Sequence, residues 1–370
     1  MRETFQQILR GEIHLHYDRL TFVNRSLAPV RLFNHLLRGV EGRLRRARPW
    51  SLPLGLQLEP TVRCQLTCPQ CPRTTAVGGP TESDMPWDDY ARLMGEIGPS
   101  LGVVAFWQWG EPLLHPRIAD MIRLAHGYGC LTLLSTNGQV GPDYAVGKLL
   151  DSGLDMLIIS LDGTTQGTYE QFRKDGCVEQ VTGFAAQAVA EKRRRGLTAP
   201  LINLRTVVTR DNEGELARIE DFTREIGADA YTVKSVSLYY DGSPDSPVLP
   251  RQRELRSFQY QGHAEAAAYL AEGNVCRKPW YWPCLRHDGQ LLLCECDHGG
   301  DAALGNVFQA GSFRSVWRGE QAATLRRSFR ADGQIDLGFC RRCRYKRDDA
   351  IRLLQRFDGK AGYDCRIDPA

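Results

Sequence analysis

Residues 55–71 read GLQLEPTVRCQLTCPQC, a short apolar run followed by three closely spaced cysteines. The run at 55–58 predicts a β-strand, and Cys64, Cys68 and Cys71 follow it as a CxxxCxxC loop. Thiolates this close together can all face one soft metal centre. Three thiolates are one short of a closed zinc site, whereas an iron–sulfur cluster with one open iron can bind a substrate or cofactor there. The stretch therefore predicts a strand that ends in a metal-binding loop.

Outward from this stretch, short apolar runs alternate with amphipathic segments as far as residue 235. Strands are predicted at 55–58, 103–107, 131–135, 156–160, 202–208 and 230–234. Helices are predicted at 87–97, 116–128, 144–152, 166–172, 179–194 and 213–226. This alternation is typical of repeated βα units, and it predicts an α/β protein with a parallel sheet.

The 370 residues are 42% apolar and 25% charged, values typical of a folded globular chain of about two domains. No apolar run is long enough to span a bilayer, and the first residues lack the apolar centre of a signal peptide. A cytoplasmic location is therefore expected. In a large chain at that location, the twelve cysteines more often ligate metal or take part in chemistry than form disulfides.

Basic residues concentrate at the N-terminus, where residues 1–50 hold ten arginines and four acidic residues. Apolar residues between 30 and 44 recur at helical spacing among these arginines, which predicts a basic amphipathic helix. One interpretation is an extension packed on the main domain with its arginine face in solvent. The other is peripheral membrane contact with an anionic lipid surface, or contact with an acidic partner. The predicted division is extension 1–50, βα domain 51–240, linker and helix 241–271, and cysteine-rich domain 272–370.

Further motifs stand at the ends of the later predicted strands. The residues WGEP at 109–112 follow the second strand, STNG at 135–138 closes the third, SLDG at 160–163 closes the fourth, and Arg205 lies on the fifth. The carboxyl ends of parallel strands form the rim where such folds build active sites. Together with the CxxxCxxC loop, these motifs resemble the radical S-adenosylmethionine (radical SAM) superfamily, although Trp109 replaces that family's first glycine of GGEP.

The resemblance implies a partial (β/α)6, TIM-like barrel that binds SAM at this rim. A 4Fe-4S cluster on Cys64, Cys68 and Cys71 is implied to pass one electron to SAM and split it into methionine and a 5′-deoxyadenosyl radical. The residues implied to bind SAM are Trp109, Gly110, Glu111, Asn137, Ser160, Asp162 and Arg205.

A second cysteine set lies near the C-terminus, where Cys276 and Cys294 flank Gly289 and a CxxC formed by Cys340 and Cys343 follows. Four thiolates suit a structural zinc ion as well as a 4Fe-4S cluster. The spacing resembles the short, twitch form of the SPASM domain of radical SAM proteins. The resemblance implies a small C-terminal domain with one auxiliary 4Fe-4S cluster.

The remaining cysteines of this part of the chain have no predicted role, although Cys296 or Cys365 could replace a ligand. Glu295 directly follows Cys294. By resemblance to sulfatase-maturing relatives it is a candidate general base, with a solvated or ligand-supporting carboxylate as the alternative.

The implied activity is that of a dehydrogenase-type radical SAM oxidoreductase. Its radical would abstract a substrate hydrogen, and its auxiliary cluster would accept the second electron, oxidising a sugar or aminocyclitol alcohol to a ketone. The alternatives are a RiPP or sulfatase-type peptide maturase, an epimerase or a lyase. The maturase stands second because such relatives often carry a leader-recognition domain and further SPASM cysteines, which this sequence lacks. A flavodoxin or ferredoxin-type reductant is implied, and no nucleic-acid partner is expected.

Overall fold

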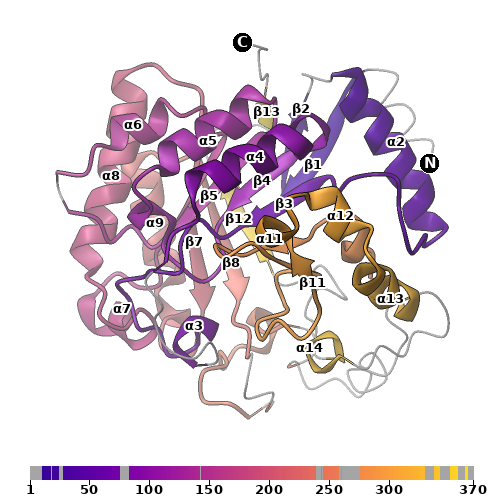
Figure 1. Cartoon of the computed structure of the whole chain (residues 1–370). Coiled ribbons are helices and arrows are strands. Elements are labelled where there is room, and N and C mark those ends of the chain that lie inside the picture. The colour runs from indigo at the N-terminus through magenta and orange to yellow at the C-terminus, as the bar shows by residue number, and fades with distance from the viewer. Residues whose placement is uncertain are drawn as a thin grey trace.

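The computed structural model describes residues 11–17, 19–24, 28–75, 83–141, 143–238, 243, 245–257, 260, 276–329, 337–341, 351–356 and 363–365 (Figure 1). Six parallel strands form the centre of its main sheet. They are β3 (Gly55–Leu58), β4 (Val103–Phe106), β5 (Leu131–Thr136), β6 (Met156–Ser160), β7 (Leu201–Val208) and β8 (Ala230–Ser235). The expected α/β fold with a parallel sheet is confirmed, and each predicted strand lies within one residue of an observed one.

Helices cover one face of this sheet, as Figure 1 shows. They are α4 (Trp87–Ile97), α5 (Ile118–Gly127), α6 (Val146–Leu150), α7 (Gln166–Phe172), α8 (Val178–Arg194) and α9 (Leu216–Ile226). Short helices α3 (Pro72–Thr75), η1 (Gly98–Ser100), η2 (Pro112–Leu114), η3 (Glu213–Glu215) and η4 (Arg253–Leu255) lie in the connections. Side chains alternate along each strand, so that Val104 and Phe106 face the helices while Val103 and Ala105 face the opposite side.

An N-terminal hairpin packs against that opposite, inner face. Its strands are β1 (Ile13–Tyr17) and β2 (Leu20–Asn24), and β13 (Tyr363–Cys365) pairs with β2 in parallel. Ile13, Leu15, Leu20 and Phe22 belong to one buried cluster with the inner side chains of β4 to β8. The main sheet is therefore buried on both faces, which explains why its strands read as continuous apolar runs.

Helix α2 (Pro29–Arg43) is the predicted basic amphipathic helix, but the side that packs on the protein is its polar side. The side chain of Arg31 is buried, and its Nε donates to the carbonyl of Leu101 at 2.5 Å. Asn34 is also buried and exchanges hydrogen bonds with the backbone of Leu52. The apolar residues instead face outward. The helix packs on the main domain, as one interpretation expected, but it does so through Arg31 and Asn34, and its exposed side carries apolar residues beside Arg43.

The C-terminal residues extend the main sheet at both edges. Strand β9 (Cys284–Leu285) lies beside β3 in parallel, and β10 (Gln290–Leu292) and β11 (Ala303–Asn306) continue from it. Strand β12 (Ile351–Arg356) pairs antiparallel with β8 at the other edge. The helices of this part are η6 (Lys278–Trp280), α11 (Val307–Ala310), α12 (Phe313–Trp317), α13 (Glu320–Ser328) and α14 (Gly338–Arg341).

The domain boundaries at 50, 240 and 271 stay predictions, and part of the predicted linker 241–271 lies outside the described residues. Among the helices that the structure describes, none has both the length and the apolar character that crossing a membrane requires.

Candidate cofactor sites at the barrel rim

The first cysteine set lies on the loop that follows β3. Cys71 donates its backbone N–H to the carbonyl of Cys68 at 3.1 Å, which closes a tight turn between two of the three thiols. Burial raises the pKa of all three thiols, that of Cys64 to about 12, where the charge of Glu111 adds to the effect. The structure thus keeps Cys64, Cys68 and Cys71 on one partly buried loop, as the sequence predicts.

Polar groups from two other loops approach these cysteines. The amide Nδ2 of Asn137, at the end of β5, lies 3.7 Å from Sγ of Cys64. Burial raises the pKa of Cys68, and the nearby Arg173 guanidinium opposes that shift. Metal binding requires the thiolate form, so an adjacent cation suits a bound cluster. The donor set and its surroundings therefore fit the cofactor that the sequence implies.

Glu111 is buried between the Cys loop and the end of β5. One carboxylate oxygen accepts hydrogen bonds from the backbone of Leu113 at 3.0 Å and from Oγ1 of Thr136 at 2.7 Å. The other accepts from the backbone of Asn137 at 2.7 Å. Its own N–H donates to the carbonyl of Arg63 at 2.7 Å. Burial raises the pKa of Glu111, against the effect of these donors. Through its carboxylate and its backbone N–H together, Glu111 therefore joins three rim segments.

The two residues before Glu111 make close contacts of different kinds. A Cβ atom on Gly110 would lie 1.8 Å from the carbonyl oxygen of Thr61, so no side chain fits where this loop passes the Cys loop. Trp109 packs against Cys284 of the C-terminal part, and the Arg286 guanidinium lies 5.3 Å from its ring centre. The residue that departs from the family pattern thus joins the barrel to the C-terminal part.

The remaining predicted SAM-binding residues divide into two groups. Ser160 and Arg205 are register partners on β6 and β7, and the Arg205 guanidinium lies 5.6 Å from the ring centre of Tyr17 on the inner hairpin. Asp162 is fully buried, pairs with Arg173 and accepts from the backbone of Val207 at 2.5 Å. Asp162 therefore fixes the end of β6 to β7, whereas Ser160 and Arg205 share the inner face.

Two cysteines of the second set, Cys276 and Cys294, lie near Cys296. A hydrogen bond with Cys296, followed by burial, raises the pKa of the Cys294 thiol. Burial raises the pKa of Cys276, and Cys296 adds to that shift. Cys340 is buried, and Cys343 lies outside the described residues. The C-x-C spacing of Cys294 and Cys296 is the sequence signal for this pair. Sequence analysis named Cys296 only as a possible replacement for a cluster ligand.

Among the described side chains, no three Cys, His, Asp or Glu residues converge closely enough to hold a single metal ion. A zinc ion needs its thiolates about 2.3 Å from one point. An iron–sulfur cluster distributes its thiolates over several iron atoms.

Glu295 lies where the C-terminal part meets the barrel. One carboxylate oxygen pairs with Lys278, and its backbone carbonyl accepts from Gln108 of the barrel at 3.1 Å. The other oxygen, Oε2, is buried and has no hydrogen-bond partner among the described residues. A buried carboxylate oxygen that accepts no hydrogen bond can take a proton from a bound molecule.

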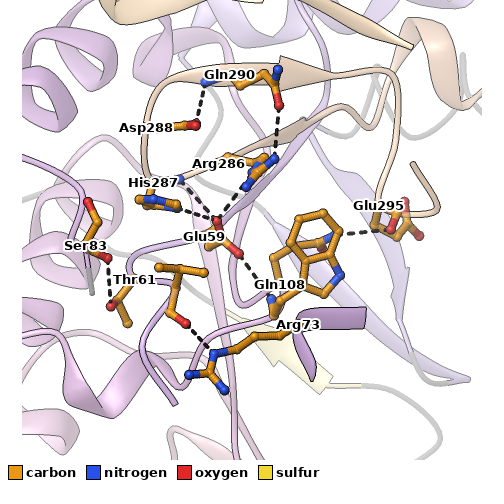
Figure 2. A network of polar contacts seen from close by, with 12 residues as sticks. Glu59, Thr61, Arg73, Ser83, Gln108, Arg286, His287, Asp288, Gln290 and Glu295 are labelled. Carbon is orange, nitrogen blue, oxygen red and sulfur yellow. Dashed lines mark hydrogen bonds and ion pairs between the residues drawn. The ribbon is translucent and has the colours of Figure 1, made fainter. Parts of the chain in front are cut away.

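A second junction, which the sequence did not reveal, centres on Glu59 directly after β3. Figure 2 shows its carboxylate facing Arg286 and His287 of the C-terminal part. The Nδ1 of His287 lies 2.7 Å from Oε2 of Glu59, and both side chains are buried. Separating a buried pair is costly, because each partner is left uncompensated. This contact therefore holds the C-terminal part against the barrel.

Comparisons with known proteins match both parts of the chain. Residues 58–223 match the model of the radical SAM superfamily, and residues 276–344 match that of an iron–sulfur cluster-binding domain called SPASM. The chain is a radical SAM enzyme with a C-terminal SPASM domain. Its expected cofactors, SAM with a SAM-binding and an auxiliary 4Fe-4S cluster, are those of these two domains.

Two curated relatives have similar sequences. One is the tungsten-containing aldehyde ferredoxin oxidoreductase cofactor-modifying protein of Pyrococcus furiosus, which is 28% identical over 257 residues, 65% of this chain and 70% of the relative. The other is the PqqA peptide cyclase of Ruegeria pomeroyi, which is 29% identical over 320 residues, 78% of this chain and 82% of the relative.

Among solved structures, SuiB of Streptococcus suis bound to S-adenosylmethionine superposes with a TM-score of 0.62. The match covers 85% of this chain and 76% of SuiB at 16% identity. Another SuiB structure holds its precursor peptide SuiA. Because the identity is low, this likeness establishes the shared fold.

Proposed function

We propose that this radical SAM enzyme modifies a peptide. The observation that carries the proposal is the similarity to PqqA peptide cyclase, which extends over 78% of this chain and 82% of that relative. The sugar or aminocyclitol alcohol that the sequence analysis placed first has no support among these relatives. The peptide-modifying alternative therefore takes its place.

The rim residues have separate parts in this proposal. When bound, SAM and the clusters supply a radical that abstracts hydrogen and an acceptor for one electron. Cys64, Cys68 and Cys71 would ligate the first cluster, and Ser160 and Arg205 face the inner side where SAM would lie. The second cluster would use Cys276, Cys294, Cys340 and Cys343, with Cys296 as a further candidate ligand.

Glu295 would act as the base of the reaction. After hydrogen abstraction, Oε2 of Glu295 would accept the proton that the peptide radical releases, and the second cluster, when bound, would supply the acceptor for its electron. One SAM is consumed, and the peptide is oxidised by two electrons. Oε2 is buried and has no hydrogen-bond partner among the described residues, which supports this role, because Lys278 pairs only with the other oxygen.

Glu295→Gln is expected to slow peptide oxidation by roughly a hundredfold, because the amide cannot accept the proton. SAM cleavage in the first half of the reaction should change far less. The measurement compares rates of product and 5′-deoxyadenosine formation. Asp288→Asn, at an exposed position in the turn between β9 and β10, is the matched control and should leave both rates unchanged. Equal loss of both rates would contradict the role as base.

The substrate class can be tested with the reconstituted full chain, SAM and a chemical reductant under anaerobic conditions. The probes are the PqqA peptide, which a curated relative cyclises, and a panel of sugars and aminocyclitols. We expect the peptide to stimulate 5′-deoxyadenosine formation and to lose two hydrogens by mass. Turnover of a sugar with an inert peptide would overturn the proposal, and a peptide product of unchanged mass would overturn its oxidative part. A flavodoxin or ferredoxin-type reductant should replace the chemical one.

A further inference from the structure

The exposed large apolar side chains of the described residues all lie in one short segment. They are Val30 (56% exposed), Phe33 (67%), Leu36 (39%), Val40 (56%), Leu44 (66%) and Trp50 (60%). Single exposed apolar residues are common on proteins, but a gathered set marks an interaction site. We name this set, including Leu44 and Trp50 beyond the end of the helix, the apolar face of α2.

The positions of these residues place most of them on one side of the helix. Steps of three or four residues from Val30 to Leu44 follow one helical face, and at about 1.5 Å per residue they cover about 20 Å. In Figure 1, α2 lies at the edge of the molecule, away from α6 and α8. The apolar face of α2 is therefore a continuous strip at the periphery.

Polar contacts hold this strip outward. Arg31 and Asn34, on the other side of α2, bond to backbone groups of the barrel. Glu41 accepts from the backbone of Trp50 at 2.9 Å and of Ser51 at 2.8 Å. Rotating the helix to bury its apolar face would break these buried hydrogen bonds, and unsatisfied buried groups are costly. The outward orientation is thus built into the packing.

The segment that carries the apolar face is mainly positive, and of its arginines Arg48 pairs with the exposed Glu320 of α13. Residues 28–50 contain six arginines and one acidic residue, Glu41, which is buried. Arg43 is exposed, and the guanidinium of Arg46 lies 3.7 Å from the ring centre of Trp50. Apolar side chains beside arginines and a tryptophan are the features of a helix that lies in the interface of an anionic bilayer.

We propose that the apolar face of α2 docks this enzyme on an anionic phospholipid surface. A second copy of the chain is the competing occupant. Each side of a stable protein interface contributes about 20–30 residues. The six side chains of the face fall well short of that number, whereas membrane binding requires only a shallow apolar strip with adjacent positive charge.

The test uses the full chain with its clusters reconstituted. Binding is measured by sedimentation with vesicles of phosphatidylcholine alone, or of phosphatidylcholine mixed with phosphatidylglycerol. We expect binding to the mixed vesicles that weakens with salt, because exposed charges are screened. The double variant Phe33→Ser, Val40→Ser should bind at least about tenfold more weakly. Arg43→Glu should also bind more weakly, while Lys148→Glu, at an exposed position on α6, should bind like the parent.

Iron content and SAM cleavage equal to the parent would verify that the double variant is folded. Equal vesicle binding by the parent and the double variant, or none by either, would overturn the proposal. Light scattering after size exclusion measures the oligomeric state and so tests whether a second copy of the chain occupies the face. A parent dimer that becomes monomeric in the double variant, without vesicle binding by either, would assign the face to a second copy and would also overturn it.

Discussion

Replacing Cys64, Cys68 and Cys71 together with alanine is expected to abolish SAM cleavage and to remove about half of the bound iron. The reason is that all three thiols lie on one loop after β3, whereas the second set belongs to the SPASM domain. Two 4Fe-4S clusters correspond to about eight iron atoms per chain, so about four should remain. The measurements are iron and sulfide content after anaerobic reconstitution, and 5′-deoxyadenosine formation.

Cys130→Ala is the matched control for this experiment. Its thiol is fully buried in the core between carbonyls of Gly98 and Leu101, away from both cysteine sets. The control should keep all its iron and cleave SAM. Zinc in place of the remaining iron of the triple variant would contradict an auxiliary cluster, and loss of all iron would contradict two independent sites.

Glu111→Gln is expected to weaken SAM binding at least about tenfold and to lower the melting temperature by a few degrees. One of the two oxygens would become an NH2 group. That group would face either the Asn137 N–H or the two donors on the other oxygen, Leu113 N–H and Thr136 Oγ1. Two donors facing each other in a buried site cost on the order of 1–3 kcal/mol. The distorted rim would also lack the charge that can meet the SAM ammonium group.

Thr136→Val separates positioning from charge, because it removes one donor to Glu111 and keeps the carboxylate. It also removes the acceptor of the Gly138 N–H, so it should lower the melting temperature comparably. We expect it to weaken SAM binding less than Glu111→Gln does. Calorimetric SAM titration and thermal unfolding give the two quantities. Unchanged SAM affinity in Glu111→Gln would refute the binding role.

The barrel was predictable because its signals are local. Strands buried on both faces read as continuous apolar runs, and β6 has the predicted bounds, Met156–Ser160. Helix α4 likewise matches the predicted range, since its apolar residues recur at helical spacing. The cysteine loop and the rim motifs then follow from the rule that the carboxyl ends of parallel strands share one edge.

The N-terminal hairpin was missed although its pattern is present. Ile13, Leu15 and Tyr17 alternate with polar residues, and Leu20 and Phe22 continue the alternation after a short turn. The period of two indicates strands, but nothing local indicates that they pack inside a barrel. That placement depends on the inner side chains of five other strands.

The sequence by itself determined the order of βα units, both cysteine spacings and the rim loops that carry them, because each depends on residues close together in the chain. Tertiary structure decided which side of α2 faces out, because only the fold places carbonyls of Leu101 and Tyr128 against Arg31. It also decided the pairing of Glu59 with His287. The two residues are 228 positions apart and meet only because β9 pairs with β3. Such contacts arise from packing between distant segments, and local spacing carries no signal for them.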